Sequence, residues 1–263
     1  MKLPIVATQP VLTVNGVQKL YAINRGCQDV NFSLYPGEVL GIVGESGSGK
    51  STLLHCLSGQ TPPDSGDITY HSHAGEAHNI YTINEAKRRL LMRSEFGIVK
   101  QHPRDGLRMR VSAGANIGER LMAVGDRHYS HIRQVATDWL EQVEIDAERV
   151  DHLPSEFSGG MQQRLQIARV LATHPRLVLM DEPTGGLDVS VQAKILDLIR
   201  ALVSELNLSV IMVTHDLAVA RLLCHRLLVM QKSRVVESGL TDQILDDPQH
   251  PYTQLLVSSV LTP

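Results

Sequence analysis

One stretch of the sequence decides the fold, and it reads Val39-Leu40-Gly41-Ile42-Val43 followed by Gly44-Glu45-Ser46-Gly47-Ser48-Gly49-Lys50-Ser51. The first part is an unbroken apolar run, which predicts a strand buried on both faces of a parallel sheet. The second part has the spacing G-x-x-x-x-G-K-[ST] of a phosphate-binding loop, or P-loop, and a helical segment at 51–58 follows it. A strand, a glycine-rich turn and a helix in this order predict an α/β protein with a nucleotide site at the turn.

The residue types of this loop suit the binding of phosphate groups. Glycines let the backbone wrap closely, so that N–H groups point at phosphate oxygens. We expect Lys50 to neutralise the β- and γ-phosphates and the Ser51 hydroxyl to ligate Mg²⁺. The other loop residues expected at the nucleotide are Gly44, Ser46, Gly47, Ser48, Gly49 and Thr52. The loop alone does not separate a kinase from a GTPase or a motor ATPase.

Further apolar runs alternate with helical segments along the chain. We expect strands at 177–180 and 210–213, a closing hairpin at 227–230 and 234–237, and helices at 162–172, 189–206 and 216–224. Residues 101–160 differ, because they carry two amphipathic helical segments, the clearer at 131–143, and no convincing strand. The expected organisation is one domain, residues 1–263, with a core lobe at about 1–100 and 161–263 and a mainly helical insertion at about 101–160.

Composition and charge exclude several classes of protein. The chain has 263 residues with 25 Lys+Arg against 28 Asp+Glu. It lacks the excess of basic residues that is typical of nucleic-acid-binding proteins, so no nucleic-acid partner is predicted. The cysteines Cys27, Cys56 and Cys224 lie far apart, which suits a reducing compartment. The N-terminus lacks the layout of a secretory signal, and no apolar window approaches the roughly 20 residues that span a bilayer. A cytoplasmic location is therefore expected.

Two acidic residues, Asp181 and Glu182, follow the apolar run 177–180. The carboxyl ends of parallel strands form the edge at which α/β proteins bind ligands, so both carboxylates are expected near the P-loop. Asp181 suits the holding of Mg²⁺ through water, and Glu182 suits the polarisation of the attacking water. A solvated strand end is the alternative explanation of such a pair, and the P-loop upstream makes it the weaker one.

The segment Ser158-Gly159-Gly160-Met161-Gln162-Gln163-Arg164 opens a helix, where backbone N–H groups and the positive helix end can face a phosphate. It resembles the signature motif of the ABC (ATP-binding cassette) ATPases, commonly L-S-G-G-Q, with Phe157 and Met161 in place of leucine and glutamine. In that family the signature faces the γ-phosphate of the ATP bound by the opposite subunit. The resemblance implies this contact for Ser158, Gly159 and Gly160. It also implies the P-loop NTPase fold of ABC ATPases, with a RecA-like parallel-sheet core, an antiparallel edge sheet and a helical subdomain.

Four further residues match motifs of the family in the family's order. Gln101 resembles the Q-loop glutamine, which reaches the metal and the attacking water, and Asp188 resembles the D-loop aspartate at the dimer interface. His215 resembles the switch histidine that contacts the γ-phosphate. Tyr21 resembles the aromatic residue that stacks on adenine, although a single tyrosine near a strand is ordinarily a core residue. The resemblance therefore implies a Mg-ATP hydrolase with catalytic roles for Glu182, His215 and Gln101 and metal ligation by Ser51, Gln101 and Asp181.

Two branches of the family share marks with this chain. Residues 157–161 and the tail Asp247-Pro248-Gln249-His250-Pro251-Tyr252-Thr253 resemble oligopeptide and dipeptide importers, which would give it permease chains as partners. Residues 101–108 and 111–121 resemble more closely the ATPase of the bacterial carbon–phosphorus lyase system. That resemblance implies a head-to-tail, ATP-dependent homodimer on a soluble lyase core that degrades phosphonates, with segment 102–121 as the docking surface. An ABC protein acting on DNA or ribosomes and a P-loop kinase are the weaker alternatives.

Overall fold

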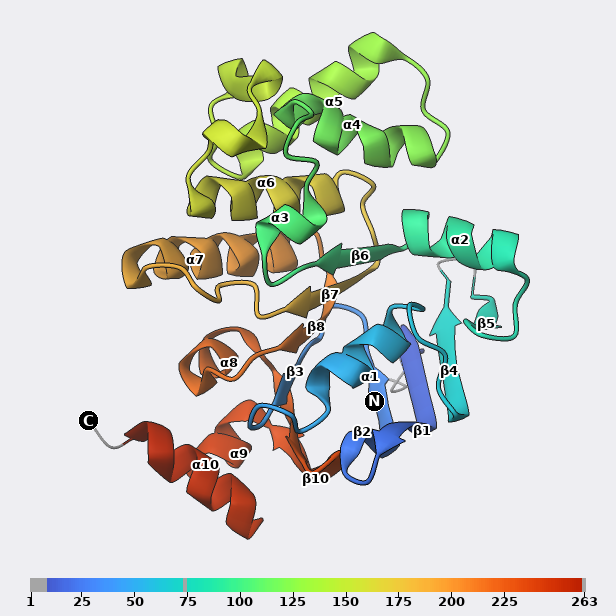
Figure 1. Cartoon of the computed structure of the whole chain (residues 1–263), viewed down its shortest axis with the longest axis vertical. Coiled ribbons are helices and arrows are strands. Elements are labelled where there is room, and N and C mark those ends of the chain that lie inside the picture. The colour runs from blue at the N-terminus through green and yellow to red at the C-terminus, as the bar shows by residue number, and fades with distance from the viewer. Residues whose placement is uncertain (1–8, 73–74, 262–263) are drawn as a thin grey trace, which may run out of the picture.

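The computed structural model describes residues 9–72 and 75–261 (Figure 1). Its larger sheet has six strands in the order β10-β9-β3-β8-β7-β6. Four neighbouring pairs are parallel and β10 runs antiparallel to β9. The strands are β3 (Val39–Val43), β6 (Phe96–Val99), β7 (Leu177–Asp181), β8 (Ser209–Val213), β9 (Arg226–Gln231) and β10 (Arg234–Leu240). The strands and the closing hairpin expected from the sequence are confirmed to within three residues.

Each central strand is buried on both faces, which explains its unbroken apolar run. In β3, Leu40 and Ile42 pack into one hydrophobic cluster, whereas Val39 and Val43 pack into another on the opposite face. Side chains of a strand alternate between the two faces of a sheet, so both sets must be apolar when both faces are covered. The helix α1 (Lys50–Leu57) covers the first face.

A smaller antiparallel sheet lies beyond α1, with the order β2-β1-β4-β5. Its strands are β1 (Leu12–Ala22), β2 (Arg25–Leu34), β4 (Ser65–His71) and β5 (Ala77–Asn79). Apolar side chains from both sheets and from α1 form a single cluster. The P-loop helix is therefore held between two sheets (Figure 1). The helix α2 (Glu85–Ser94) then leads back to β6.

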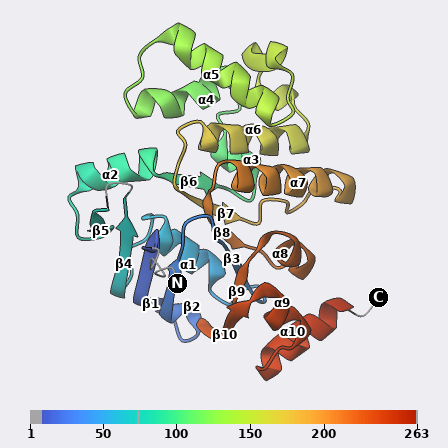
Figure 2. The ribbon, with the colours of Figure 1, turned by 180° about the vertical axis from the view of Figure 1, so that it is seen from behind.

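Helices gather on the other face of the central sheet, in the upper part of Figures 1 and 2. They include α3 (Pro103–Gly106), α4 (Ala113–Ala123), α5 (Tyr129–Gln142), the 3₁₀ turns Ala147–Asp151 and Pro154–Glu156, and α6 (Gly159–Leu171). In the C-terminal half, α7 (Val189–Glu205) lies next to α6, and α8 (Leu217–Leu223), α9 (Thr241–Asp246) and α10 (Pro251–Leu261) lie lower in both figures. Helix α6 begins at Gly159, three residues before the expected start, because Ser158 caps it through its hydroxyl.

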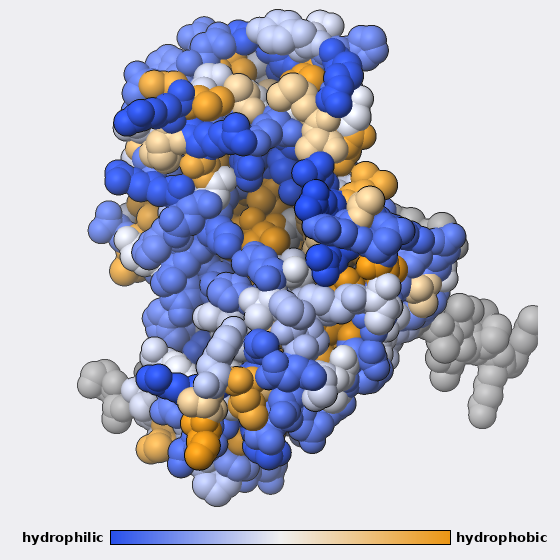
Figure 3. Space-filling model, turned by 45° about the vertical axis from the view of Figure 1, so that its right-hand side comes forward, coloured by the Kyte–Doolittle hydropathy of each residue, from blue (hydrophilic) through white to orange (hydrophobic). Residues whose placement is uncertain are grey.

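Figure 3 shows one face of the molecule, which is largely hydrophilic with apolar residues in separate patches. Among the described residues, none of the helices combines the length and the hydropathy that a membrane-spanning segment requires.

Candidate functional site

A cavity of about 820 Å³ lies at the carboxyl edge of the central sheet. Ten of the residues expected at a nucleotide site line it, namely Tyr21, Ser46, Gly47, Gly49, Lys50, Ser51, Thr52, Gln101, Glu182 and His215. They come from the first strand, the P-loop, the segment after β6 and the ends of β7 and β8. Except for Tyr21, which comes from β1 of the antiparallel sheet, these residues follow strands of the parallel sheet that end at this edge.

The backbone of the P-loop depends on glycine at three positions. Gly44, Gly47 and Gly49 have φ angles of 145°, 80° and 107°, a region that side chains disfavour. A Cβ atom at Gly49 would lie 1.9 Å from the carbonyl oxygen of Gly26, and one at Gly44 would lie 2.2 Å from that of Met230. The loop is thus pressed against β2 and β9, and this close approach fixes its curvature.

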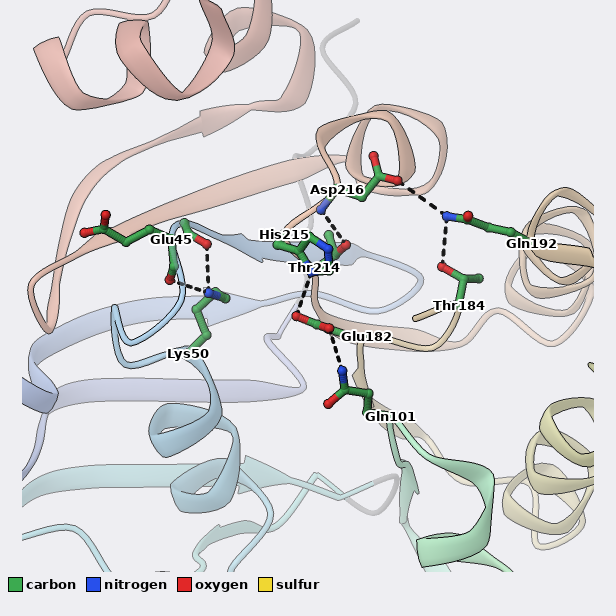
Figure 4. A network of polar contacts seen from close by, with 10 residues as sticks. Glu45, Lys50, Gln101, Glu182, Thr184, Gln192, Thr214, His215 and Asp216 are labelled. Carbon is green, nitrogen blue, oxygen red and sulfur yellow. Dashed lines mark hydrogen bonds and ion pairs between the residues drawn. The ribbon is translucent and has the colours of Figure 1, made fainter. Parts of the chain in front are cut away.

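Lys50 lies at the floor of the cavity with 7% of its surface exposed. Its Nζ donates to the carbonyl oxygens of Gly44 and Glu45, each at 2.8 Å (Figure 4). Burial lowers the pKa of Lys50, while the nearby carboxylates of Glu182 and Asp181 act in the opposite direction. Within the described part of the chain, its hydrogen-bond partners are carbonyl groups, so this buried cation is well placed to bind an anionic ligand.

Glu182 is held between two of the expected catalytic side chains. Its Oε2 accepts from Gln101 Nε2 and its Oε1 contacts His215 Nδ1, both at 2.8 Å (Figure 4). The residue has a φ angle of +41°, and its N–H donates to the carbonyl oxygen of Val213 at 2.9 Å. Such a left-handed conformation in a non-glycine residue is uncommon, and here it turns the carboxylate into the cavity.

Asp181 ends strand β7 one residue earlier. Burial raises the pKa of its carboxyl group, and the negative charge of Glu182 adds to the effect. Ser51, Gln101 and Glu182 line the cavity, and Asp181 directly precedes Glu182, so this part of the site carries oxygen donors of the kind that Mg²⁺ prefers. The residues present therefore fit this cation, whose charge would offset the crowding of the two acids.

The signature residues and Asp188 do not line this cavity. Ser158 is exposed at the N-terminus of α6, and its Oγ accepts from the N–H of Met161 at 3.3 Å. Gly160 packs so closely on α7 that a Cβ atom would lie 2.5 Å from Val191 Cγ1. Asp188 accepts the N–H groups of Val191 and Gln192 with its carbonyl oxygen, at the start of α7. In one chain these residues therefore lie outside the P-loop cavity.

The structure adds polar residues that sequence reasoning missed. Arg25 and Gly26 line the cavity from the tip of the β1–β2 hairpin that carries Tyr21, and no motif marks them. Gln192 Nε2 contacts Thr184 Oγ1 at 3.3 Å and Asp216 Oδ2 at 3.4 Å, which links α7 to the residue after His215 (Figure 4). Asp216 is the last residue of the Thr-His-Asp pattern that contains His215, and this position was the signal that could have identified it.

Gln166 of α6 is another missed residue, and it is fully buried. Its Oε1 accepts the N–H of Lys100 at 2.8 Å, and its Nε2 donates to the carbonyl oxygen of Lys100 at 3.1 Å. This pair of hydrogen bonds fixes the backbone directly before Gln101. The sequence pattern does not distinguish Gln166 from an ordinary polar residue on the solvent-facing side of an amphipathic helix, so its burial could not be predicted.

Comparison with known families agrees with this geometry. Residues 27–185 match the family described as ABC transporter, and residues 236–263 match the C-terminal region of oligopeptide/dipeptide transporters. Among solved structures, part of the ABC transporter complex cbiONQ, cbiO1 from Clostridium perfringens, aligns with a TM-score of 0.78 and 27% identity. That alignment covers 90% of this chain and 91% of the other. A dimeric ATP-binding cassette in a post-hydrolysis state with ADP and Pi aligns with a TM-score of 0.75 and 29% identity. That alignment covers 88% of this chain and 98% of the other.

Curated relatives show high similarity along nearly the whole chain. The phosphonates utilization ATP-binding protein PhnK of Escherichia coli K12 is 66% identical over 96% of this chain and 98% of its own length. The dipeptide transport ATP-binding protein DppF of Haemophilus influenzae is 36% identical over 95% of this chain and 78% of its own length. The resemblance and the fold expected from the sequence are confirmed. The chain belongs to the ABC transporter ATPase family, and it is an ATP-binding protein that hydrolyses ATP.

Proposed function

We propose that this chain forms a head-to-tail homodimer around two Mg-ATP molecules and drives a soluble carbon–phosphorus lyase core in phosphonate breakdown. The main support for this proposal is the 66% identity to PhnK, a phosphonates utilization protein, across 98% of that protein's length. Such a partner would place the dimer in the cytoplasm, where ATP is available. The identity extends through the family-specific core and the segments around it, so the resemblance is not confined to the nucleotide site.

Within each ATP site we assign the chemistry to residues that line the cavity and to Asp181, which precedes Glu182 at the end of β7. Lys50 and the P-loop amides would bind the β- and γ-phosphates, and Tyr21 would lie against the adenine at the cavity mouth. Ser51, Gln101 and Asp181 would hold Mg²⁺, whose positive charge would offset that of the phosphates. Burial and the neighbouring charge of Glu182 raise the pKa of Asp181, and this supports the assignment because a bound cation would offset the two negative charges.

Glu182 is proposed as the group that polarises the attacking water. Its two oxygens are occupied by Gln101 and His215, so these side chains aim the carboxylate and must release it in part when ATP arrives. His215 would then turn toward the γ-phosphate. Ser158, Gly159, Gly160 and Asp188 would complete the site from the second copy, because in one chain they lie outside the cavity. Closure of the two copies would exclude water and complete the electrostatic cradle.

Segment 102–121 is proposed as the docking surface for the lyase core. It contains α3 and most of α4, and it follows Gln101 directly. Arg108 is already paired with Glu119, Nη2 to Oε1 at 2.6 Å, so reversing its charge would also disturb α4. Arg104 is the cleaner test. Arg104→Glu should weaken co-purification with the partner and leave ATP binding intact, whereas Arg200→Glu on α7 should change neither; equal recovery of the partner by both variants would count against this surface.

A second function is supported by a specific observation. Residues 236–263 match the C-terminal region of oligopeptide/dipeptide transporters, and DppF is 36% identical. The alternative is therefore the ATP-binding subunit of a peptide importer, with the same catalytic residues and permease chains as partners.

Affinity capture of tagged Glu182→Gln protein from its native cells with ATP separates the two functions. Recovery of soluble lyase subunits is the expected result. Recovery of proteins with several membrane spans in their place would replace the lyase with a permease. Wild-type protein captured without ATP is the matched control, because a partner that requires the closed dimer should be enriched only on the trapped variant.

A further inference from the structure

The tail segment that includes Gln249, His250, Pro251 and Tyr252 reaches the nucleotide site. Tyr252 lies in the first turn of α10 and is 9% exposed. Its hydroxyl oxygen accepts a hydrogen bond from the backbone N–H of Glu45 at 2.9 Å, across 207 positions of sequence. Glu45 is the second residue of the P-loop. In Figure 1, α10 lies at the lower left with α9, on the side of the molecule where the loop enters α1.

The peptide groups of Glu45 are thereby held from both directions. Its carbonyl oxygen accepts Lys50 Nζ at 2.8 Å and the N–H of Ser48 at 3.2 Å, whereas its N–H is directed to Tyr252. A backbone N–H in a P-loop can serve either the ligand or the protein. That of Glu45 serves the protein, so the tail fixes the rim of the cradle while other amides remain available for phosphate.

The local sequence of the tail explains how the hydroxyl is presented. Pro251 occupies the first helical position, where the lack of an N–H has no cost. The ring nitrogen Nδ1 of His250 accepts the N–H of Tyr252 at 3.1 Å. The carboxylate of Glu237 on β10 accepts the N–H groups of Gln249 at 2.8 Å and His250 at 3.1 Å. These contacts tie the start of α10 to the edge of the central sheet and leave the tyrosine little freedom.

Two other elements support the P-loop from different sides. Gly49 packs against the carbonyl oxygen of Gly26 on β2, and the N–H of Ser233, in the β9–β10 turn, donates to the carbonyl oxygen of Ser48 at 3.0 Å. Both of these contacts hold the part of the loop nearest α1. Tyr252 holds the opposite part, nearest β3. Burial raises the pKa of Tyr252, so its hydroxyl stays neutral and keeps this acceptor role at physiological pH.

We propose that Tyr252 is a positioning residue for nucleotide binding, which sets the P-loop through the Glu45 peptide before ATP arrives. The C-terminal segment 249–252 then supports the ATP site, although none of its residues lines the cavity. The inference rests on the P-loop being the nucleotide site, as proposed above. Preorganisation of the loop lowers the ordering cost of binding, so its loss should weaken affinity more than it slows the chemical step.

Tyr252→Phe is the direct test, since it keeps the ring and removes the hydroxyl. We expect affinity for a fluorescent ATP analogue to fall by about three- to tenfold, the scale of one lost hydrogen bond, and the KM for ATP to rise equally. The kcat should change little. Tyr70→Phe is the matched control: Tyr70 is fully buried and its hydroxyl donates to Glu95 Oε2 at 2.7 Å, away from the cavity. It should lower Tm without changing the KM.

Lys50→Ala separates failure of this inference from failure of the proposed site. If Lys50→Ala weakens binding and Tyr252→Phe matches Tyr70→Phe in KM and affinity, Tyr252 has only a packing role and the inference is wrong. If Lys50→Ala binds the analogue normally, the P-loop is not the site and the proposed function fails with it. A rise in KM confined to Tyr252→Phe, at equal Tm change in the two tyrosine variants, supports the positioning role.

Discussion

The P-loop cavity and the signature segment differ in how complete they are within one chain. The cavity gathers Lys50, Gln101, Glu182 and His215 around one hollow and satisfies them with short hydrogen bonds. The signature has Ser158 at an exposed helix N-terminus that contacts its own helix. The first region gathers its polar groups around one cavity, whereas Ser158 of the second lies exposed at the surface, outside that cavity.

This difference indicates how a single fold can make hydrolysis depend on assembly. Residues that bind the phosphates or orient the catalytic carboxylate can be fixed inside one chain, where packing holds them in place at low entropic cost. Groups that must act only after closure are better placed on a surface that meets the site in a dimer. Variants in the two regions should therefore fail in different ways.

The largest effect is expected from Glu182→Gln. The amide cannot accept a proton, so hydrolysis should slow by about 10²–10⁴-fold, the scale of losing a general base. Binding should persist, because Lys50 and the P-loop amides are unchanged. Single-turnover hydrolysis and titration with an ATP analogue measure the two quantities separately. Near-normal turnover would remove Glu182 from this role.

Ser158→Arg tests the other region and should lower hydrolysis by about 10²–10³-fold, as expected when groups facing the reacting phosphate are lost. Each chain should still bind ATP, since Ser158 lies outside the cavity. Gel filtration with ATP should show monomers in place of a trapped dimer.

Mixing the two variants gives a sharper test of the shared site. A Ser158→Arg chain still has Glu182, and a Glu182→Gln chain still has an intact signature. Their heterodimer would contain one complete site, so the mixture should recover part of the activity that each variant lacks alone. If no activity returns although heterodimers form, the two regions do not meet across an interface.

The sequence predicted the P-loop region well because its chemistry is local. The turn from Val43 into Lys50 needs glycines at fixed spacing, and strands buried on both faces leave unbroken apolar runs. The antiparallel strands β1 and β2 were expected only through the family resemblance. Their pairing is interrupted by irregular register, for example between Val14 and Val17, which obscures a period of two.

Contacts between distant segments could not be predicted from patterns. Arg25 enters the cavity because its hairpin folds over the P-loop, and Tyr252 reaches Glu45 from the other end of the chain. Such contacts depend on tertiary packing, since neither residue type nor spacing specifies which backbone group lies opposite. The roles of the site residues accordingly remain predictions to be measured.

Gln166→Leu tests the link between the two regions, since Gln166 belongs to the signature helix and binds the residue before Gln101. Both polar groups of the Lys100 backbone would lose a buried partner, which should lower the free energy of unfolding by about 1–3 kcal/mol. A displaced Gln101 should also reduce kcat by roughly tenfold, because small shifts at a catalytic group are costly.

Asn116→Leu is the comparison variant for Gln166→Leu. Asn116 is an equally buried amide, and it bonds to the backbone at Arg108, Val111 and Ser112 but not to the segment before Gln101. It should lose stability in denaturant unfolding while kcat stays close to the wild-type value. Equal losses of kcat in both variants would show that instability alone accounts for the effect.

The smallest effect is expected from Asp181→Asn in nucleotide-free protein, and its sign is positive. Burial, aided by Glu182, raises the pKa of Asp181, so the ionised carboxylate is disfavoured in the folded state. Asparagine removes that charge, and the free energy of unfolding at pH 7 should rise by about 0.5–2 kcal/mol, the usual range for a single stabilising substitution. Hydrolysis should fall, because a proposed metal ligand is lost.

The dependence on pH shows whether charge is the cause. A folded-state pKa above the ordinary 3.8 means that the folded chain binds more protons, so wild-type stability falls as pH rises from 3.8 through the raised value. The advantage of Asp181→Asn should therefore be largest at pH 7 and shrink toward acid pH. Asp151→Asn should show the opposite sign, since the bond with Arg133 lowers the pKa of Asp151 and its loss destabilises at pH 7. If Asp181→Asn raises the free energy of unfolding equally at pH 7 and at acid pH, the gain comes from packing around residue 181 and not from the removal of its negative charge.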